Sequence, residues 1–269
     1  MLNKKLEILD NILKDLKSVV IAFSGGVDST FLLHRASQIR KLKTCAVTIR
    51  TPYIPKREID EAIEFCIKHN INHAILDVNF PEDIRNNPPD RCYLCKKLLF
   101  NHIKSFADKN GYLYIADGSN ADDNGDFRPG LKALEEMGIR SPLMESGLIK
   151  HEIRQLSQKK GLPTWNKPAY ACLLTRIPYE TKITENDLRM VEKAEQFLFD
   201  KGFPGTRVRK HGDIARIECL PGYINKLTQE TERDHIINNL KKIGFRYISL
   251  DLEGYRSGSL NPEKDKNDH

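Results

Sequence analysis

The chain has 269 residues, 39% of them hydrophobic, and its 43 basic and 37 acidic residues give a formal net charge of +6. This length allows a sizeable core and one or two domains. Apolar runs fall short of the ~20 residues that a membrane span needs, and the stretch 1–7 is typical of an amphipathic helix rather than a signal peptide. We therefore expect a cytoplasmic protein without a membrane partner. The mild positive charge suits a polyanionic small ligand and allows RNA, although an ordinary protein surface explains it equally well.

The first part of the chain predicts alternating helices and strands. A lead-in helix is expected first, and the strands and helices that follow alternate with a spacing typical of βα repeats. This alternation predicts an α/β fold, a doubly wound and mostly parallel sheet. The expected helices cover 2–17, 28–40, 57–69 and 95–108, and the expected strands cover 19–23, 44–49, 73–78 and 112–116. Residues 141–160 predict a strand-like entry and then a helix, on which Lys150 and Arg154 are interpreted as a solvated face.

A linker over 161–168, with two prolines and the only tryptophan, predicts a domain boundary. The expected domains are therefore 1–168 and 169–256, followed by a polar tail over 257–269 that has a disordered composition. The second domain is predicted to be a small α+β unit. Its expected elements are a helix from 184 to 201, a hairpin of 206–210 with 214–218, a helix over 222–242 and a strand over 247–252.

A glycine-containing turn joins the first strand to the next helix. Ser24, Gly25 and Gly26 break the apolar strand, and Asp28 and Ser29 begin the helix. Glycines let backbone N–H groups approach an anion, and a helix N-terminus favours negative charge there. The alternative is a tight turn without a ligand. The turn has no lysine and is not a Walker A loop, but it resembles the SGGxDS pyrophosphate loop of the PP-loop ATP pyrophosphatase superfamily.

Two further strand ends are candidates for the same ligand. In doubly wound sheets, ligands lie at the carboxyl ends of the strands. Arg50 follows the second strand and opens a loop over 50–55, so residues 48–53 are expected to hold an adenine and ribose. Asp117 and Gly118 follow the fourth strand, and the PP-loop resemblance implies that this turn lies opposite the first one.

The six cysteines are not expected to form disulfides in a cytosolic protein. Cys45 and Cys66 lie on the apolar sides of a predicted strand and helix, so we expect them in the core. Cys92 and Cys95 have the C-x-x-C spacing of a metal or cluster site, for which two ordinary helix residues are the alternative.

Cys172 lies next to the predicted domain boundary and near Arg176, and cationic neighbours favour the reactive thiolate. Structural zinc normally takes four protein ligands, whereas the sequence offers three convincing ones in Cys92, Cys95 and Cys172. A 4Fe-4S cluster on three thiolates leaves one iron open for a sulfide. Three ligands therefore favour a working iron–sulfur cluster, with zinc still open.

Arg207 and Arg209 alternate with Val208, so both arginines are predicted on one face of a strand, where Arg216 joins them if the register allows. Paired guanidinium groups suit a phosphate or a carboxylate. A solvated hairpin face is the alternative.

Together these motifs resemble the LarE family of ATP-dependent sulfur transferases over nearly the whole chain. Beyond the turn at 24–29 and Cys172, the matching stretches are 126–133, 165–167, 176–179, 207–209, 213–218 and 256–258. In that family a pyridinium dicarboxylate mononucleotide is adenylylated and then thiolated, for a nickel-pincer cofactor. The three cysteines resemble the branch that uses a 4Fe-4S cluster carrying an extra sulfide, rather than the branch that sacrifices a single cysteine.

The resemblance implies a role for each candidate residue. The ATP phosphates, with Mg²⁺, are expected on the turn, with Asp28, Cys172 and Arg176 as catalytic groups and Cys92, Cys95 and Cys172 as metal ligands. Substrate binding is expected at Asp126, Arg128, Arg207 and Arg209. Other expected partners are sulfide or a sulfur donor and further copies of the chain.

Three other functions remain open. A tRNA thiolase of the same superfamily is the nearest alternative, although we see no strongly basic face for nucleic acid. A ligase fed by glutamine-derived ammonia would not need the three cysteines. A nucleotide-binding regulator would bind ATP without releasing pyrophosphate.

Overall fold

The computed structural model describes residues 2–125, 129–168 and 172–256, except the side chains of 124, 125 and 129. The chain divides into two compact units, which are considered one at a time below. The first contains Met1–Pro81 and Asp90–Ala169, and the second contains Glu82–Pro89 and Tyr170–His269. Segment 82–89 thus groups with the C-terminal residues, although it lies between two elements of the first unit.

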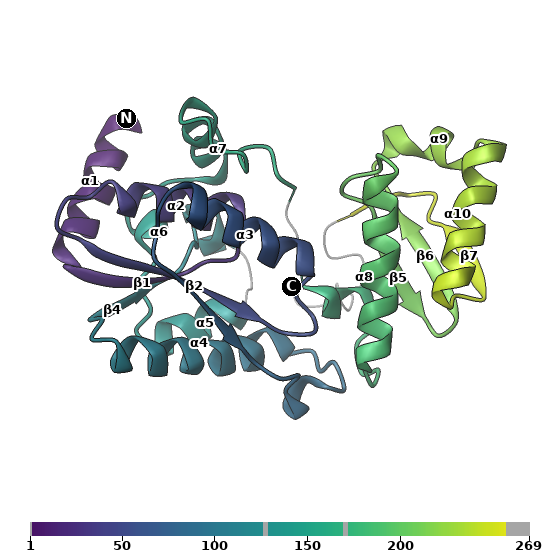
Figure 1. Ribbon diagram of the computed structural model, residues 1–269, viewed down its shortest axis with the longest axis horizontal. Coiled ribbons are helices and arrows are strands. Elements are labelled where there is room, and N and C mark those ends of the chain that lie inside the picture. The colour runs from purple at the N-terminus through teal and green to yellow at the C-terminus, as the bar shows by residue number, and fades with distance from the viewer. Residues whose placement is uncertain (1, 126–128, 169–171, 257–269) are drawn as a thin grey trace, which may run out of the picture. The chain divides into compact units, whose positions relative to one another are not determined.

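The first unit is built on a four-stranded parallel sheet with the order β3-β2-β1-β4 (Figure 1). Its strands are β1 (Ser18–Ala22), β2 (Lys43–Arg50), β3 (His73–Asp77) and β4 (Tyr114–Ala116). Each neighbouring pair is parallel, so all four carboxyl ends lie at one edge of the sheet. The predicted doubly wound α/β fold is confirmed.

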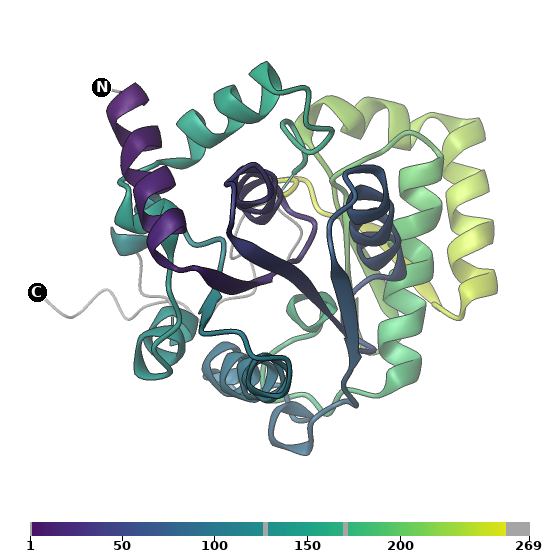
Figure 2. The same ribbon diagram turned by 60° about the vertical axis from the view of Figure 1, so that its left-hand side comes forward.

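Helices cover both faces of this sheet (Figures 1 and 2). One layer contains α1 (Leu2–Asp15), α2 (Val27–Ser37), α3 (Lys56–Lys68), α6 (Pro142–Glu145) and α7 (Lys150–Lys159). The other contains α4 (Arg91–Lys109) and α5 (Pro129–Glu136). Successive side chains of β1 point to opposite faces of the sheet. Val19 and Ile21 pack in the core under the first layer of helices, and Val20 packs in the core under the second layer. This explains why the strand is apolar at every position after Ser18.

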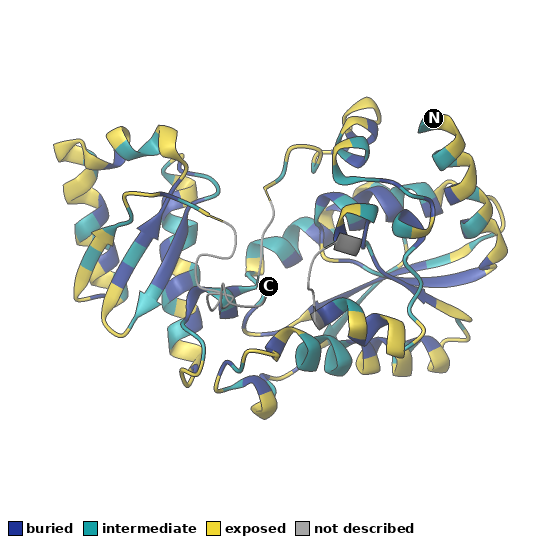
Figure 3. Ribbon diagram, turned by 180° about the vertical axis from the view of Figure 1, so that it is seen from behind, coloured by how far each residue is buried: buried dark blue, intermediate teal, exposed yellow. Residues whose placement is uncertain are grey.

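The second unit has a three-stranded sheet, β5 (Arg207–His211), β6 (Ile214–Glu218) and β7 (Tyr247–Leu250), in that order. Strands β5 and β6 are antiparallel, and β6 and β7 are parallel. Helices α8 (Glu185–Asp200), α9 (Ile224–Thr228) and α10 (Glu230–Ile243) cover its core. Figure 3 shows that helices of both units place buried residues toward the core and exposed ones outward.

Several boundaries differ from the sequence prediction. The expected strand near 141 is the short helix α6, which Pro142 begins. The helix expected over 222–242 is a 3-10 turn, Pro221–Tyr223, followed by α9 and α10. Cys45 and Cys66 are buried as predicted, and burial raises the pKa of Cys66 to about 12. Among the described residues, no helix combines the length and the apolar character needed to cross a membrane.

Candidate functional site

The turn after β1 lies at the carboxyl edge of the parallel sheet and leads directly into α2. Strand β1 ends at Ala22, and α2 begins at Val27 with Gly26 as its N-terminal cap. Gly25 has a φ of +66°, a left-handed conformation that glycine adopts without strain. A Cβ at Gly25 would lie 3.4 Å from its nearest neighbour, which is an ordinary contact. Backbone conformation rather than space therefore requires this glycine.

Two serines hold the turn in shape. Ser24 Oγ lies 3.1 Å from Ser29 Oγ, and the Gly26 N–H donates to Ser24 Oγ at 3.4 Å. Ser29 Oγ also lies within hydrogen-bond distance of the Gly26 carbonyl, at 3.4 Å. The first N–H groups of a helix have no acceptor within it, and the helix dipole adds positive potential at that end. This geometry suits a phosphate group.

The loop after β4 packs directly against the first turn of α2. A Cβ on Gly118 would lie 2.9 Å from the backbone nitrogen of Ser29, so the approach requires glycine. The buried Asp117 carboxylate accepts hydrogen bonds from Ser119 N at 3.2 Å, Ser119 Oγ at 2.5 Å and Ser141 Oγ at 2.7 Å. The two strand ends therefore meet, with Gly118 at the contact and Asp117 as the anchor of its own loop.

Asp28, in the first turn of α2, has a cationic partner from another helix. Its Oδ2 lies 2.5 Å from Nζ of Lys150, the first residue of α7. Its buried Oδ1 has no hydrogen-bond partner in the part of the chain that the structure describes. Burial raises the pKa of Asp28; Lys150 opposes this effect and the Asp123 carboxylate adds to it. Asp28 thus lies near a second carboxylate and near the cations Lys150 and Arg154, and its buried Oδ1 is an oxygen of the kind that a divalent cation binds.

Lys167, in the linker after α7, reaches the same turn. Its Nζ donates to the Gly25 carbonyl at 3.0 Å and pairs with Glu61 of α3 at 2.5 Å. Arg154 of α7 donates to two carbonyls of this linker, at 2.8 Å each. The interpretation of Lys150 and Arg154 as a solvated helix face is therefore wrong. Lys150 contacts Asp28 in the first turn of α2, and Arg154 holds the linker that carries Lys167.

Arg50 ends β2 at the same edge of the sheet. It pairs with Asp77, its neighbour in register on β3, through contacts of 2.5 and 2.9 Å. This hydrogen-bonded pair raises the pKa of Arg50 and lowers that of Asp77. Both side chains are exposed, so the pair adds little stability. Contact of Arg50 with a nucleotide stays a prediction.

Cys92 and Cys95 lie at the start of α4, three positions apart, and therefore on one helix face. Cys92 is exposed and Cys95 is half-buried. Cys95 Sγ lies 3.3 Å from the hydroxyl of the buried Tyr53. All six cysteines are described, and none forms a disulfide. Within either unit, no three described His, Cys, Asp or Glu side chains group as metal ligands, so the described part of the first unit offers a pair of thiols.

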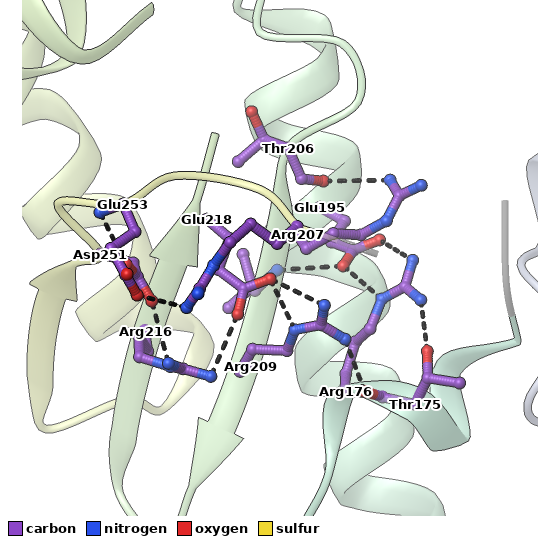
Figure 4. Close-up of polar contacts among 12 residues, drawn as sticks. Thr175, Arg176, Glu195, Thr206, Arg207, Arg209, Arg216, Glu218, Asp251 and Glu253 are labelled. Atoms are coloured by element: carbon purple, nitrogen blue, oxygen red, sulfur yellow. Dashed lines mark hydrogen bonds and ion pairs between the residues drawn. The ribbon is translucent and has the colours of Figure 1, made fainter. Parts of the chain in front are cut away.

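Cys172 directly precedes the 3-10 helix Leu173–Arg176 in the second unit. Arg176 is 1% exposed and donates to Glu195 at 2.8 and 3.1 Å and to Thr175 Oγ1 at 2.6 Å (Figure 4). Burial opposes the charge of Arg176, but Glu195 and the nearby Cys172 more than offset it, so the pKa of Arg176 is raised. Burial likewise opposes the charge of Glu195, yet Arg176 keeps the pKa of Glu195 lowered. Cys172 thus lies close enough to act on a guanidinium whose charge Glu195 compensates.

Asn87 ties segment 82–89 to the loop that follows Cys172. The side chain is fully buried, and its amide donates to three carbonyls of the loop 174–178, at 2.8, 2.9 and 3.4 Å. Its φ of +54° is a left-handed conformation that asparagine tolerates better than most residues. The loop after Cys172 is therefore fixed to a segment that ends just before Cys92.

Arg207 and Arg209 flank Val208, whose side chain joins the core of the second unit, so the arginines lie on the other face of β5 as predicted. They are 2% and 4% exposed, which excludes the alternative of a solvated face. Arg207 donates to the Thr206 carbonyl at 3.3 Å, and its guanidinium carbon lies 5.2 Å from the centre of the Tyr255 ring.

Arg209 belongs to a buried charge network (Figure 4). It donates to the Glu218 carboxylate at 2.9 and 2.7 Å and to the Thr175 carbonyl at 2.6 Å. Arg216, opposite Arg209 in register, contacts Glu218 at 3.0 Å and Asp251 at 2.9 Å. Because Glu218 is fully buried, these cations are needed to compensate its charge. Substrate binding on this face of the sheet stays a prediction.

Asp126 and Arg128, two further predicted substrate contacts, lie outside the described residues.

No family model matches the chain. The chain is similar to one subunit of a glutamine-hydrolyzing GMP synthase from Thermoplasma volcanium, with 29% identity over 177 residues, 60% of this chain and 57% of that one. The parallel sheet and its glycine turn agree with this likeness, and they define a protein of the PP-loop class.

Two other relatives match nearly end to end. A pyridinium-3,5-bisthiocarboxylic acid mononucleotide synthase from Lactiplantibacillus plantarum is 38% identical over 252 residues, 93% of this chain and 91% of that one. An uncharacterized protein from Synechocystis is 39% identical over 263 residues, 97% of this chain and 98% of that one. The chain therefore belongs to the LarE family, and it is an enzyme.

Proposed function

We propose that this enzyme converts a carboxylate of a pyridinium dicarboxylate mononucleotide into a thiocarboxylate, with ATP as co-substrate, in nickel-pincer cofactor biosynthesis. The observation that carries this proposal is the 38% identity, over 93% of the chain, to a synthase whose name states the thiolated product. The turn formed by residues 24–29, at the carboxyl edge of the parallel sheet, has a geometry that suits a phosphate and so supports a nucleotide co-substrate. A cytoplasmic location and a homo-oligomeric state belong to the same proposal.

Activation is the first step of the proposed reaction. A substrate carboxylate oxygen attacks the α-phosphorus of ATP, and pyrophosphate leaves. A carboxylate is a poor acyl electrophile because its oxide does not depart, whereas AMP does. The turn from Ser24 to Ser29 would hold the departing phosphates, assisted by Lys167. Asp28 and Asp123 would hold Mg²⁺, which would neutralise part of the negative charge of the phosphates.

Sulfur transfer is the second step. Sulfide attacks the acyl carbon, so that a C–S bond forms as the C–O bond to AMP breaks, with no change of oxidation state. Cys92, Cys95 and Cys172 would hold a 4Fe-4S cluster, which would supply the sulfide. The donor set fits this group because iron in such clusters takes cysteine thiolates, and none of the three cysteines is in a disulfide.

We assign substrate binding to the face of β5 that carries Arg207 and Arg209. We propose that Arg207 and Arg209 contact the phosphate or the second carboxylate of the substrate, together with Asp126 and Arg128. The strong burial of Arg207 and Arg209 means that such contacts would be sheltered from water, where charge-assisted hydrogen bonds are strongest.

Substrate-dependent release of pyrophosphate tests the activation step. The purified enzyme is incubated with ATP, Mg²⁺ and either the dicarboxylate mononucleotide, bulk tRNA or ammonium. Release stimulated by the mononucleotide supports the proposal, and Asp28→Asn should abolish it. Stimulation by tRNA instead would favour a tRNA thiolase. An amidated product that needs no cysteine would favour the ligase class to which the GMP synthase relative belongs.

Anaerobic purification tests the cluster separately. Iron and acid-labile sulfide are assayed in the wild type and in Cys92→Ala and Cys172→Ala, with the buried Cys219→Ala as the matched control. The proposal expects bound iron and sulfide that both site variants lose and the control retains. A colourless, zinc-loaded wild type would overturn the cluster.

A further inference from the structure

Lys150 places a positive charge beside the turn formed by residues 24–29, although it lies far away in the sequence. It lies 122 residues after Asp28, and its Nζ is 2.5 Å from Asp28 Oδ2. The lysine side chain is 34% exposed and the aspartate side chain 18% exposed. The ammonium therefore compensates a largely buried carboxylate while keeping contact with solvent.

The backbone at the start of α7 is firmly anchored. The Lys150 N–H donates to Asp122 Oδ2 at 2.8 Å, and the Ile149 N–H donates to Glu152 at 3.1 Å. Glu152 also pairs with Lys5 of α1 at 2.7 Å. The lysine thus combines a fixed Cα with a flexible four-carbon side chain, which suits a cation that changes partners without moving its helix.

The charges around Asp28 favour such a change of partner. The Asp123 carboxylate is close enough to act on Asp28, which Lys150 contacts directly and Arg154 influences from further away. A divalent cation on these carboxylates would lie within a few ångströms of the ammonium and repel it. The triphosphate that arrives with that cation offers the ammonium several anionic oxygens.

We propose that Lys150 is a triphosphate-binding residue that exchanges partners, leaving Asp28 to the divalent cation and moving to the phosphate oxygens when Mg-ATP binds. It takes the place of the lysine that a Walker A loop carries in its own sequence. This inference rests on the proposed use of ATP. It adds Lys150 to the residues that bind the triphosphate, and it adds the order in which Lys150 changes partners.

Two binding measurements on the full chain test the exchange. The variants are Lys150→Met and Lys150→Gln, and Lys159→Met at the exposed end of the same helix is the matched control. Calorimetry should show that both Lys150 variants weaken Mg-ATP binding by about tenfold or more. Mn²⁺ alone, followed by its electron paramagnetic resonance signal, should bind these variants more tightly than the wild type, because the competing ammonium is gone. The control should match the wild type in both.

If Lys150 exchanges partners, its replacement raises the affinity for Mn²⁺ alone and lowers the affinity for Mg-ATP. If its role is only structural, replacement lowers both affinities. Unchanged or jointly weakened binding in Lys150→Gln, with thermal unfolding like that of the control, would overturn the inference. Failure of the wild type itself to bind Mg-ATP would instead overturn the proposed co-substrate. The double variant Asp28→Asn/Lys150→Met should lose the gain in Mn²⁺ affinity.

Discussion

Replacing Gly118 by alanine should weaken both the first unit and its nucleotide binding, because the added methyl group would press on the N-terminus of α2. The methyl carbon would lie 2.9 Å from Ser29 N, 3.1 Å from its Cα and 3.3 Å from its Cβ. Ordinary contacts of such a carbon begin at 3.4 Å, so the loop and helix must separate by about 0.5 Å. Two of the three atoms are backbone, which cannot rotate out of the way.

Overpacking of this kind costs about 1–3 kcal/mol of unfolding free energy. The same displacement moves the first N–H groups of α2 relative to a bound phosphate, and losing one such hydrogen bond weakens binding by about tenfold. Urea unfolding and calorimetry with Mg-ATP measure the two effects. Gly222→Ala is the matched control, because a Cβ there meets nothing within 4 Å. Wild-type stability and affinity in Gly118→Ala would refute this reasoning about the contact between the two loops.

Four further predictions concern other parts of the chain. Arg209→Met should cost about 3–5 kcal/mol in urea unfolding because it leaves the buried Glu218 carboxylate undercompensated, and Arg209→Met/Glu218→Gln should recover much of that loss. Asn87→Gly keeps the left-handed backbone but removes three side-chain hydrogen bonds, so about 1–3 kcal/mol should be lost; a neutral result would contradict the tie between its segment and the loop 174–178. Burial lowers the pKa of His73 below 6.5, so the unfolded chain binds the proton first; stability should fall as the pH drops through 6.5, and His73→Gln should reduce this slope in thermal melts. Cys172→Ala should abolish thiolation and spare adenylylation, as seen in the ratio of thiolated product to pyrophosphate; loss of both with an intact fold would contradict this division of roles.

The sequence predicted the parts of the fold and site that local pattern determines. The apolar run of β1, the Ser24–Ser29 turn and the alternation of strands and helices correctly predicted the parallel sheet and a glycine-containing turn at its carboxyl edge. The alternation in β5 correctly placed Arg207 and Arg209 on one face. The boundaries near Pro142 and within 222–242 were wrong because proline and short turns divide segments whose hydrophobic pattern looks continuous.

Contacts between segments that are far apart in the sequence could not be predicted from local sequence pattern. Lys150 and Lys167 reach the turn from 122 and 142 residues away, and helical spacing alone made the first look solvated. The burial of Arg209 depends on Glu218, which only the strand register brings beside it. Lys167 lay within a stretch that resembled the LarE family, and that resemblance was the one available signal for it.

The mass of the reaction product tests the proposed function most directly. The anaerobically purified enzyme is incubated with the pyridinium dicarboxylate mononucleotide, Mg-ATP and a sulfide source, and the nucleotide product is analysed by mass spectrometry. Exchange of one carboxylate oxygen for sulfur, with one AMP formed for each sulfur introduced, is the result expected. An unchanged nucleotide, from an enzyme that binds both substrates and releases pyrophosphate, would contradict the assignment of sulfur insertion to this chain.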